Sequence, residues 1–180
     1  MNFVLIIFLV IRPFATGPSH NDKLAESLIE FRIDNAGIEV SGVIDEVQAD
    51  INFNEKNTAK SSIVAKARPI HIRTGILIRD KHLQRSDYFH ADRFPEITLT
   101  STSFKKVGRN KFLGTFILTI KNFKEEITIP FSIEHRGNTM IYSGAFEINR
   151  LNFGLGEQSL ILDNIVKVVV TASVKKSSGY

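Results

Sequence analysis

Residues 47–53 read Val-Gln-Ala-Asp-Ile-Asn-Phe, in which apolar and polar residues alternate without an error. A period of two is typical of a β-strand with one face buried and one face in water, because successive side chains point to opposite sides. The same alternation recurs over residues 127–134 and over residues 166–175. The dominant period therefore indicates an all-β chain.

The remaining strand candidates are rich in β-branched and aromatic residues and are bounded by turn signals. They span residues 28–34, 38–44, 62–72, 97–104, 112–121 and 140–149. Short turns such as Gly108-Arg109-Asn110 separate them. About eight or nine strands with short connections predict an antiparallel up-and-down barrel or a sandwich, and closure into a barrel removes the exposed edges of the sheet.

The regular pattern breaks at residues 75–95. Here residues 80–84 and 86–89 predict one or two short helical turns near residues 79–92, which end before Pro95. The length of 180 residues is sufficient for one domain with a sizeable core. We therefore expect a single barrel domain over residues 28–176.

The N-terminus carries the one candidate targeting segment. Residues 3–11 form an uninterrupted apolar run that is too short to span a bilayer but suits the apolar region of a signal peptide. Ala15 and Gly17 are spaced like a cleavage site. We expect a signal peptide at residues 1–17, a flexible lead-in at 18–27, and a periplasmic or secreted bacterial protein. The alternative is a first strand that is buried in the sheet.

Composition argues against several classes of function. The formal net charge is +4 with scattered basic residues, which does not favour nucleic-acid binding. Cysteine is absent, so disulfides, thiolate metal sites and a cysteine nucleophile are excluded. The five histidines show no metal-ligand spacing, and the chain lacks a Gly-x-Ser-x-Gly elbow and a phosphate-binding glycine loop. We expect no metal, no cofactor and no enzymatic activity.

An ordered set of motifs follows Thr74. It comprises Thr-Gly at 74–75, Arg-Asp-Lys-His-Leu at 79–83, Asp-Tyr-Phe at 87–89 and Pro-Glu-Ile-Thr-Leu-Thr-Ser-Thr at 95–102. This order resembles the YceI-like family, with Tyr88 and Leu99 in place of phenylalanine. The likeness continues at residues 114–120, 148–154 and 162–166, and it covers roughly residues 28–175. The motif with which the family pattern begins is shorter than usual in this chain, where it corresponds to residues 35–42.

The family consists of small lipocalin-like barrels associated with polyisoprenoid and other long-chain lipid binding. The resemblance implies a barrel of eight strands or so and a long-chain lipid or isoprenoid as partner, without stable membrane insertion. Small inward residues would leave room along the barrel axis, which favours a tunnel over a solid core: Ala49, Ala65, Ala67, Ala145 and Ala172. The alternative is a filled barrel that acts as a protein-interaction or stress-response module.

The inward positions predict the apolar lining of such a tunnel, although each could equally belong to a plain core. They are Phe53, Ile63, Ile72, Phe89, Phe94, Leu99, Phe116, Leu118, Phe131, Phe146, Phe153, Val168 and Val170. The outward residues Ile117 and Val169 are candidates for a homodimer contact.

A polar clamp is predicted at the barrel mouth, formed by Arg79, Asp80, His82, Arg150 and Asp163. Asp80 could cap the short helix, and Arg79 could bind carbonyl groups or a carboxylate. We favour this structural role over contact with a ligand head group. A hydrolase that uses His82 is a further alternative, for which the sequence offers no second catalytic group.

Overall fold

The computed structural model describes residues 23–175, which form one antiparallel sheet with a single short α-helix. The signal peptide expected at residues 1–17 lies outside the described residues. The strands are β1 Lys23–Asn35, β2 Ile38–Ile44, β3 Gln48–Asn52, β4 Ser62–Ala67, β5 Ile72–Arg73, β6 Ile97–Gly108, β7 Lys111–Ile120, β8 Phe123–Arg136, β9 Thr139–Asn149 and β10 Ile165–Lys175. The helices are α1 Leu77–Leu83 and the 3₁₀ turns η1 Thr58–Lys60, η2 Pro69–His71 and η3 Arg150–Phe153.

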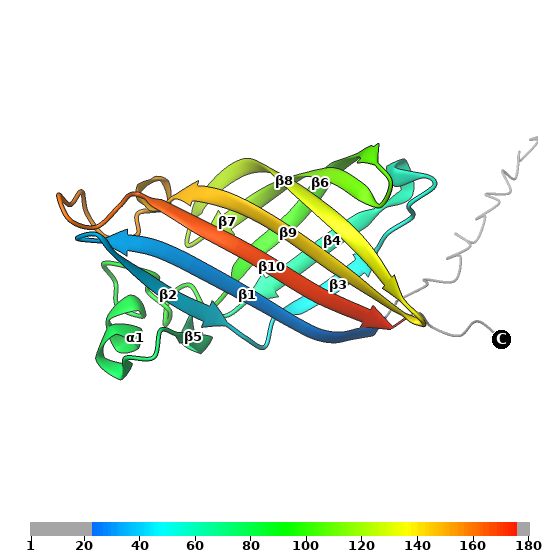
Figure 1. Ribbon diagram of the computed structural model, residues 1–180. Helices are drawn as coiled ribbons and strands as arrows, with labels where there is room; N and C mark the ends of the chain where they lie inside the picture. The colour runs from blue at the N-terminus through cyan, green and yellow to red at the C-terminus, as the bar shows by residue number, and fades with distance from the viewer. Residues whose placement is uncertain (1–22, 176–180) are drawn as a thin grey trace, which may run out of the picture.

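The sheet curls into a barrel (Figure 1). Its strand order is β3-β4-β6-β7-β8-β9-β10-β1-β2-β5. Because β2 and β3 follow one another in the chain, residues 45–47 bring the two ends of the sheet together. The side chain of Ser27 on β1 donates a hydrogen bond to the carbonyl oxygen of Val47 at 2.8 Å. The architecture is the lipocalin-like antiparallel barrel that the sequence predicts.

Three boundaries differ from the prediction. Strand β1 begins at Lys23, within the expected flexible lead-in, because its first residues pair with the end of β10. The strand predicted over residues 62–72 ends at Ala67, since Pro69 starts the 3₁₀ turn η2 and the chain resumes only as the short β5. Helix α1 begins at Leu77, earlier than expected, and residues 86–89 form turns.

The ladder between β8 and β9 covers only part of these strands. It pairs Phe131 with Gly144 and runs from there to the turn at residues 137–138. The ladder stops next to Pro130, which has no N–H group to donate. Within residues 23–175, no helix is long and apolar enough to cross a membrane.

The two ends of the barrel differ. At one end lie α1, the tip of the β1–β2 hairpin and the loop that follows η3, whereas β1 starts and β10 ends at the other (Figure 1). Aromatic side chains fill this second end. The ring of Phe53 lies edge-on to the rings of Phe104 and Phe112, with 5.0 Å between centroids in both pairs. Phe131 stacks on Phe112 at 5.4 Å.

Candidate functional site

An apolar cavity of about 380 Å³ lies inside the barrel, between the aromatic end and α1. Almost every strand contributes to its wall. The inward alanines Ala49, Ala65, Ala67 and Ala172 all line it, as their small side chains predict. Ala145 is exposed on the outer face instead, because Gly144 and Phe146 occupy the inward positions of β9. The barrel is therefore hollow at its centre.

Most of the predicted apolar lining residues border this cavity. They are Ile63, Phe89, Leu99, Phe116, Leu118, Phe131, Phe146, Val168 and Val170. Their contact with a ligand stays a prediction.

Four predicted lining residues pack elsewhere, which corrects the assignment from parity. Phe53 belongs to the aromatic cluster at the closed end. Ile72 is buried on β5 against Ile44 and its neighbours. Phe94 lies edge-on to His90 on the segment after α1, and Phe153 is fully buried in η3. All four residues are apolar, and tertiary packing rather than the sequence period determines which side chains they contact.

The lining predicted from the sequence omits the part of the wall formed by β1 and β2. Ile29, Phe31 and Ile33 border the cavity together with Val40 and Ile44. The signal was present, because residues 29, 31 and 33 are apolar at alternate positions of a predicted strand.

The cavity reaches solvent at the α1 end. Asn35 at the hairpin tip lines the cavity and is exposed, and Thr74, Arg79 and Leu162 line the same region. We call the opening bordered by these four residues the mouth. It is framed by the hairpin tip, by the chain that enters α1 and by the loop before β10.

Arg79 and Asp80 organise one side of the mouth around Thr74. The guanidinium of Arg79 donates to the Thr74 carbonyl oxygen at 2.7 Å and to Thr74 Oγ1 at 2.8 Å. The Asp80 carboxylate accepts from the Thr74 backbone N–H at 2.8 Å and also from the Thr74 hydroxyl. Asp80 does not cap α1, whose N-cap residue is Ile76. It does not line the cavity either, because its carboxylate turns back to Thr74.

His82 lines the cavity near the same side. Its Nε2 lies 3.3 Å from a carboxylate oxygen of Asp87, and its ring is edge-on to Tyr88 at 5.0 Å. Over the described part of the chain, no hydroxyl group hydrogen-bonds to His82. These two contacts orient the imidazole against the wall.

Arg150 is buried and holds the loop of residues 155–164. Its guanidinium donates to the carbonyl oxygens of Leu155 at 2.8 Å, Asp163 at 2.8 Å and Leu162 at 3.3 Å, and to the Asn164 side chain at 3.2 Å. Asp163 is exposed, and its carboxylate accepts from the backbone N–H of residue 165. Its side chain does not line the cavity, although the sequence predicts Asp163 as part of the polar clamp at the mouth.

Lys121 joins two further segments near α1. Its ammonium donates to the carbonyl oxygens of Tyr88 at 2.9 Å and Gly154 at 2.5 Å. Burial lowers the pKa of Lys121 from its usual 10.5, while the nearby Asp87 carboxylate acts in the opposite direction. No sequence motif marks this residue, because its partners are backbone carbonyls distant in sequence.

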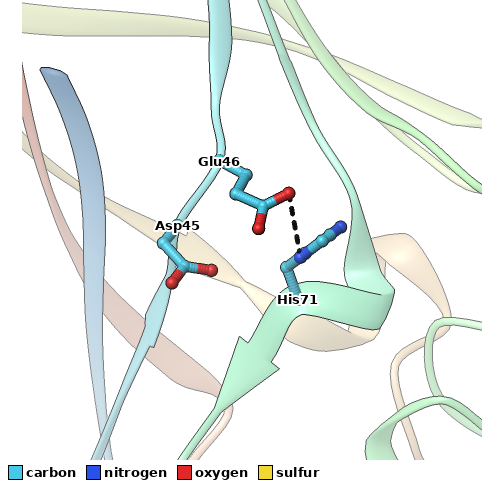
Figure 2. A group of neighbouring side chains, drawn as sticks. All are labelled: Asp45, Glu46 and His71. Carbon is cyan, nitrogen blue, oxygen red and sulfur yellow. Dashed lines mark ion pairs between the residues drawn. The ribbon is translucent and has the colours of Figure 1, made fainter.

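A group of metal-ligand type lies where residues 45–47 cross η2. One ligand atom each of Asp45, Glu46 and His71 lies within 4.8 Å of the others (Figure 2). This group could hold a divalent cation, and the sequence spacing did not reveal it because residue 71 is far from the other two. Asp45 pairs with Arg73, and a carboxylate oxygen of Glu46 lies 3.5 Å from His71 Nδ1. These contacts join residues 45–46 to η2 and β5.

A family model, described as the YceI-like domain, matches residues 21–175. The chain belongs to the YceI-like family. A UPF0312 protein of Photorhabdus laumondii is 26% identical over 153 residues, which is 79% of each chain. Other bacterial relatives, YceI proteins included, align over a shorter part, down to 59% of their own length.

Solved structures share the architecture of this YceI-like chain. BcnA of Burkholderia cenocepacia superposes with a TM-score of 0.78 at 22% identity, over 82% of this chain and 95% of that one. A polyisoprenoid-binding domain from Saccharophagus degradans superposes with a TM-score of 0.68 at 12% identity, over 86% of this chain and 97% of that one. At these identities the likeness shows the fold.

Proposed function

We propose that this YceI-like protein binds and carries a long apolar molecule, a polyisoprenoid or a fatty chain, in the barrel cavity and does not catalyse a reaction. The observation that carries this proposal is the apolar cavity itself. Its wall is built mostly from aliphatic and aromatic side chains, with few polar groups among them. Its volume falls within the range of roughly 300–1,000 Å³ that is typical of ligand pockets.

Hydrophobic burial would provide the affinity. Each methylene group that leaves water contributes about 0.8 kcal/mol, so a chain of several carbons gains substantially without any specific polar contact. The polar groups at the mouth are largely engaged with one another, as Arg79 is with Thr74. This favours a site that selects for an apolar chain more than for one head group. The polyisoprenoid-binding neighbour with the same fold supports this reading.

The full chain, purified from a bacterial host, should be extracted with organic solvent and the extract analysed by mass spectrometry. We expect a long-chain lipid in stoichiometric amounts. A C18 conjugated polyene fatty acid, which fluoresces on entering an apolar site, should then bind to lipid-stripped protein. Displacement by a polyisoprenol or by a saturated fatty acid distinguishes the two chain classes. Absence of both copurified lipid and probe binding would favour the interaction-module alternative.

Export is part of the proposal. An apolar run at residues 3–11, followed by small residues at 15 and 17, supports transfer to the periplasm or the medium. Cell fractionation with intact-mass measurement tests it, and a full-length protein retained in the cytoplasm would contradict it. A homodimer through Ile117 and Val169 also remains a prediction, which light scattering can check.

A further inference from the structure

We propose that the mouth of the barrel docks onto a lipid bilayer through a rim of exposed apolar side chains. This inference rests on the proposed function, because a chain-like lipid must reach the cavity from the phase in which it dissolves. The rim comprises Ile38, Ile76, Leu77, Ile78, Leu160 and Ile161, all of them largely exposed. Ile78 is 83% exposed and Leu160 is fully exposed. Such a group of exposed apolar residues is unusual for a free surface.

The rim and the cavity mouth are adjacent in structure as well as in sequence. Ile76, Leu77 and Ile78 lie between the mouth residues Thr74 and Arg79. Leu160 and Ile161 directly precede the mouth residue Leu162. The exposed rim residues therefore directly adjoin residues that line the cavity.

Hydrogen bonds join the hairpin part of the rim to its loop part. The backbone N–H of Ala36 donates to the Ile161 carbonyl oxygen at 2.6 Å, and Asn35 forms a β-bridge with Leu162. Ile38 pairs with Asn35 within the hairpin. These contacts join the hairpin tip that carries Ile38 to the loop that carries Leu160 and Ile161.

A second set of contacts joins the loop to the segment after α1. The backbone N–H of Gly156 donates to the Asp87 carbonyl oxygen at 2.7 Å. A Cβ atom at Gly156 would lie 3.0 Å from the Tyr88 ring. The loop is thus held on both sides of the mouth, at the end of the barrel where α1 lies (Figure 1).

The charge pattern favours a bilayer as the occupant. Residues 74–78 and 158–162 contain no charged side chain, and Glu39 beside Ile38 pairs with Arg32 at 3.5 Å, so the rim offers little free charge to an acidic or basic protein partner. Insertion of such tips into the boundary between head groups and acyl chains requires no anionic lipid. A second copy seated on the rim would instead cover the opening through which the ligand must pass. We therefore expect binding to neutral phosphatidylcholine vesicles that depends little on salt.

Site-specific labels can test this in the full chain, because the protein has no cysteine of its own. Single variants Ile78→Cys and Leu160→Cys carry an environment-sensitive fluorophore at the rim. Val107→Cys carries it at an exposed apolar residue of the β6–β7 hairpin, away from the rim. On addition of phosphatidylcholine vesicles, the two rim labels should shift to the blue and become quenchable by spin-labelled lipid. The label at residue 107 should stay in water.

A matched pair of double variants measures how much the rim contributes to the affinity for vesicles. Ile78→Ser with Leu160→Ser should weaken vesicle binding of the mouth about tenfold or more, since each large aliphatic side chain contributes at least about one factor of ten when fully buried. Binding is read from the blue shift of a label at Ile38→Cys. Val107→Ser with Val169→Ser, which removes exposed apolar side chains outside the rim, should leave that shift unchanged.

Several results would overturn the inference. One is a chain that co-floats with vesicles while the rim labels remain in water, which would assign attachment to another segment such as residues 3–11. Another is an equal shift at residue 107, or a shift of the rim labels without vesicles that grows with protein concentration, which indicates self-association. Lipid carriage is scored separately by mass spectrometry. If the protein carries lipid but its rim labels stay in water, the docking inference is contradicted and the carriage proposal stands. If the rim labels insert but the protein never holds lipid, the carriage proposal is contradicted and docking stands.

Discussion

The ring of Phe31 on β1 lies across Gly42, its paired neighbour on β2, so closely that a Cβ atom on Gly42 would be 2.3 Å from the ring Cζ. The same Cβ atom would be 2.9 Å from Thr74 Cγ2. Phe31 and Thr74 both border the cavity. The absence of a side chain at Gly42 therefore allows the Phe31 ring and Thr74 to occupy their positions at the cavity.

The Gly42→Ala variant should lose ligand affinity while the barrel stays folded. The new methyl group pushes the tip of the Phe31 ring into the hollow cavity, where space is available, so the free energy of unfolding should fall by only about 1–2 kcal/mol. Binding of the C18 polyene probe should weaken severalfold. Fluorescence titration and urea unfolding measure the two effects. Gly108→Ala is the control, because its Cβ atom would make only ordinary contact, 3.6 Å from Lys111. Unchanged probe binding in Gly42→Ala would contradict this account.

A larger side chain at Ala65 should fill the cavity from the β4 wall. Ala65 lies opposite Leu99 of β6 and borders the cavity. We expect Ala65→Phe to abolish most lipid copurification while the barrel remains folded, because a void accepts added volume with less strain than a packed core does. Extraction followed by mass spectrometry provides the measurement.

The outward-facing Ala145→Phe is the matched control for this substitution, since Ala145 is exposed on β9. It should leave the lipid content unchanged. Equal lipid content in the Ala65 and Ala145 variants would mean that the ligand does not occupy this cavity.

Lys121 should give the protein a distinctive alkaline stability profile. Because burial lowers the folded-state pKa of Lys121 below its usual 10.5, the unfolded chain binds more protons than the folded one between these two values. The penalty for burying the ammonium is fully present below the folded-state pKa. It is relieved as the pH rises through that pKa toward 10.5, so stability rises with pH in this window.

Replacement of Lys121 by methionine isolates this effect. Lys121→Met removes two hydrogen bonds to backbone carbonyls and should destabilise the fold by about 1–3 kcal/mol at neutral pH. The stability difference between the wild type and the variant should widen from neutral pH toward pH 10.5. Denaturant unfolding at closely spaced pH values measures it. A difference that stays flat or narrows across this range would refute the assignment.

Arg150 should be essential for the loop that carries Leu160 and Ile161. Arg150→Met leaves several buried acceptors without a donor, and we expect a loss of about 3 kcal/mol or more in the free energy of unfolding. Arg150→Lys should recover only part of this, because a single ammonium cannot reproduce the planar fork of the guanidinium. Hydrogen exchange should accelerate over residues 155–164. Full recovery by lysine would show that only the charge is needed.

Some of the cavity wall could be predicted from parity, and some could not. Parity places Leu99, Phe116 and Val168 on the inward face, and these residues border the cavity, while their contact with a ligand stays a prediction. Phe53 and Phe153 were assigned in the same way, yet Phe53 packs into the aromatic end and Phe153 is fully buried within η3. Alternation determines the face of a strand. It carries no information about position along the barrel axis, which depends on the stagger of neighbouring strands.

The sequence by itself determined the strands, their two faces and the irregular segment with its short helix, because these features depend on chain stereochemistry and on residues close together in sequence. Only the tertiary structure decided that the centre is hollow, that the mouth lies beside Asn35 and Leu162, and that Asp45 and Glu46 meet His71. The physical reason is distance across the barrel. Whether opposite walls touch depends on how the curled sheet closes, and no short stretch of sequence records that separation.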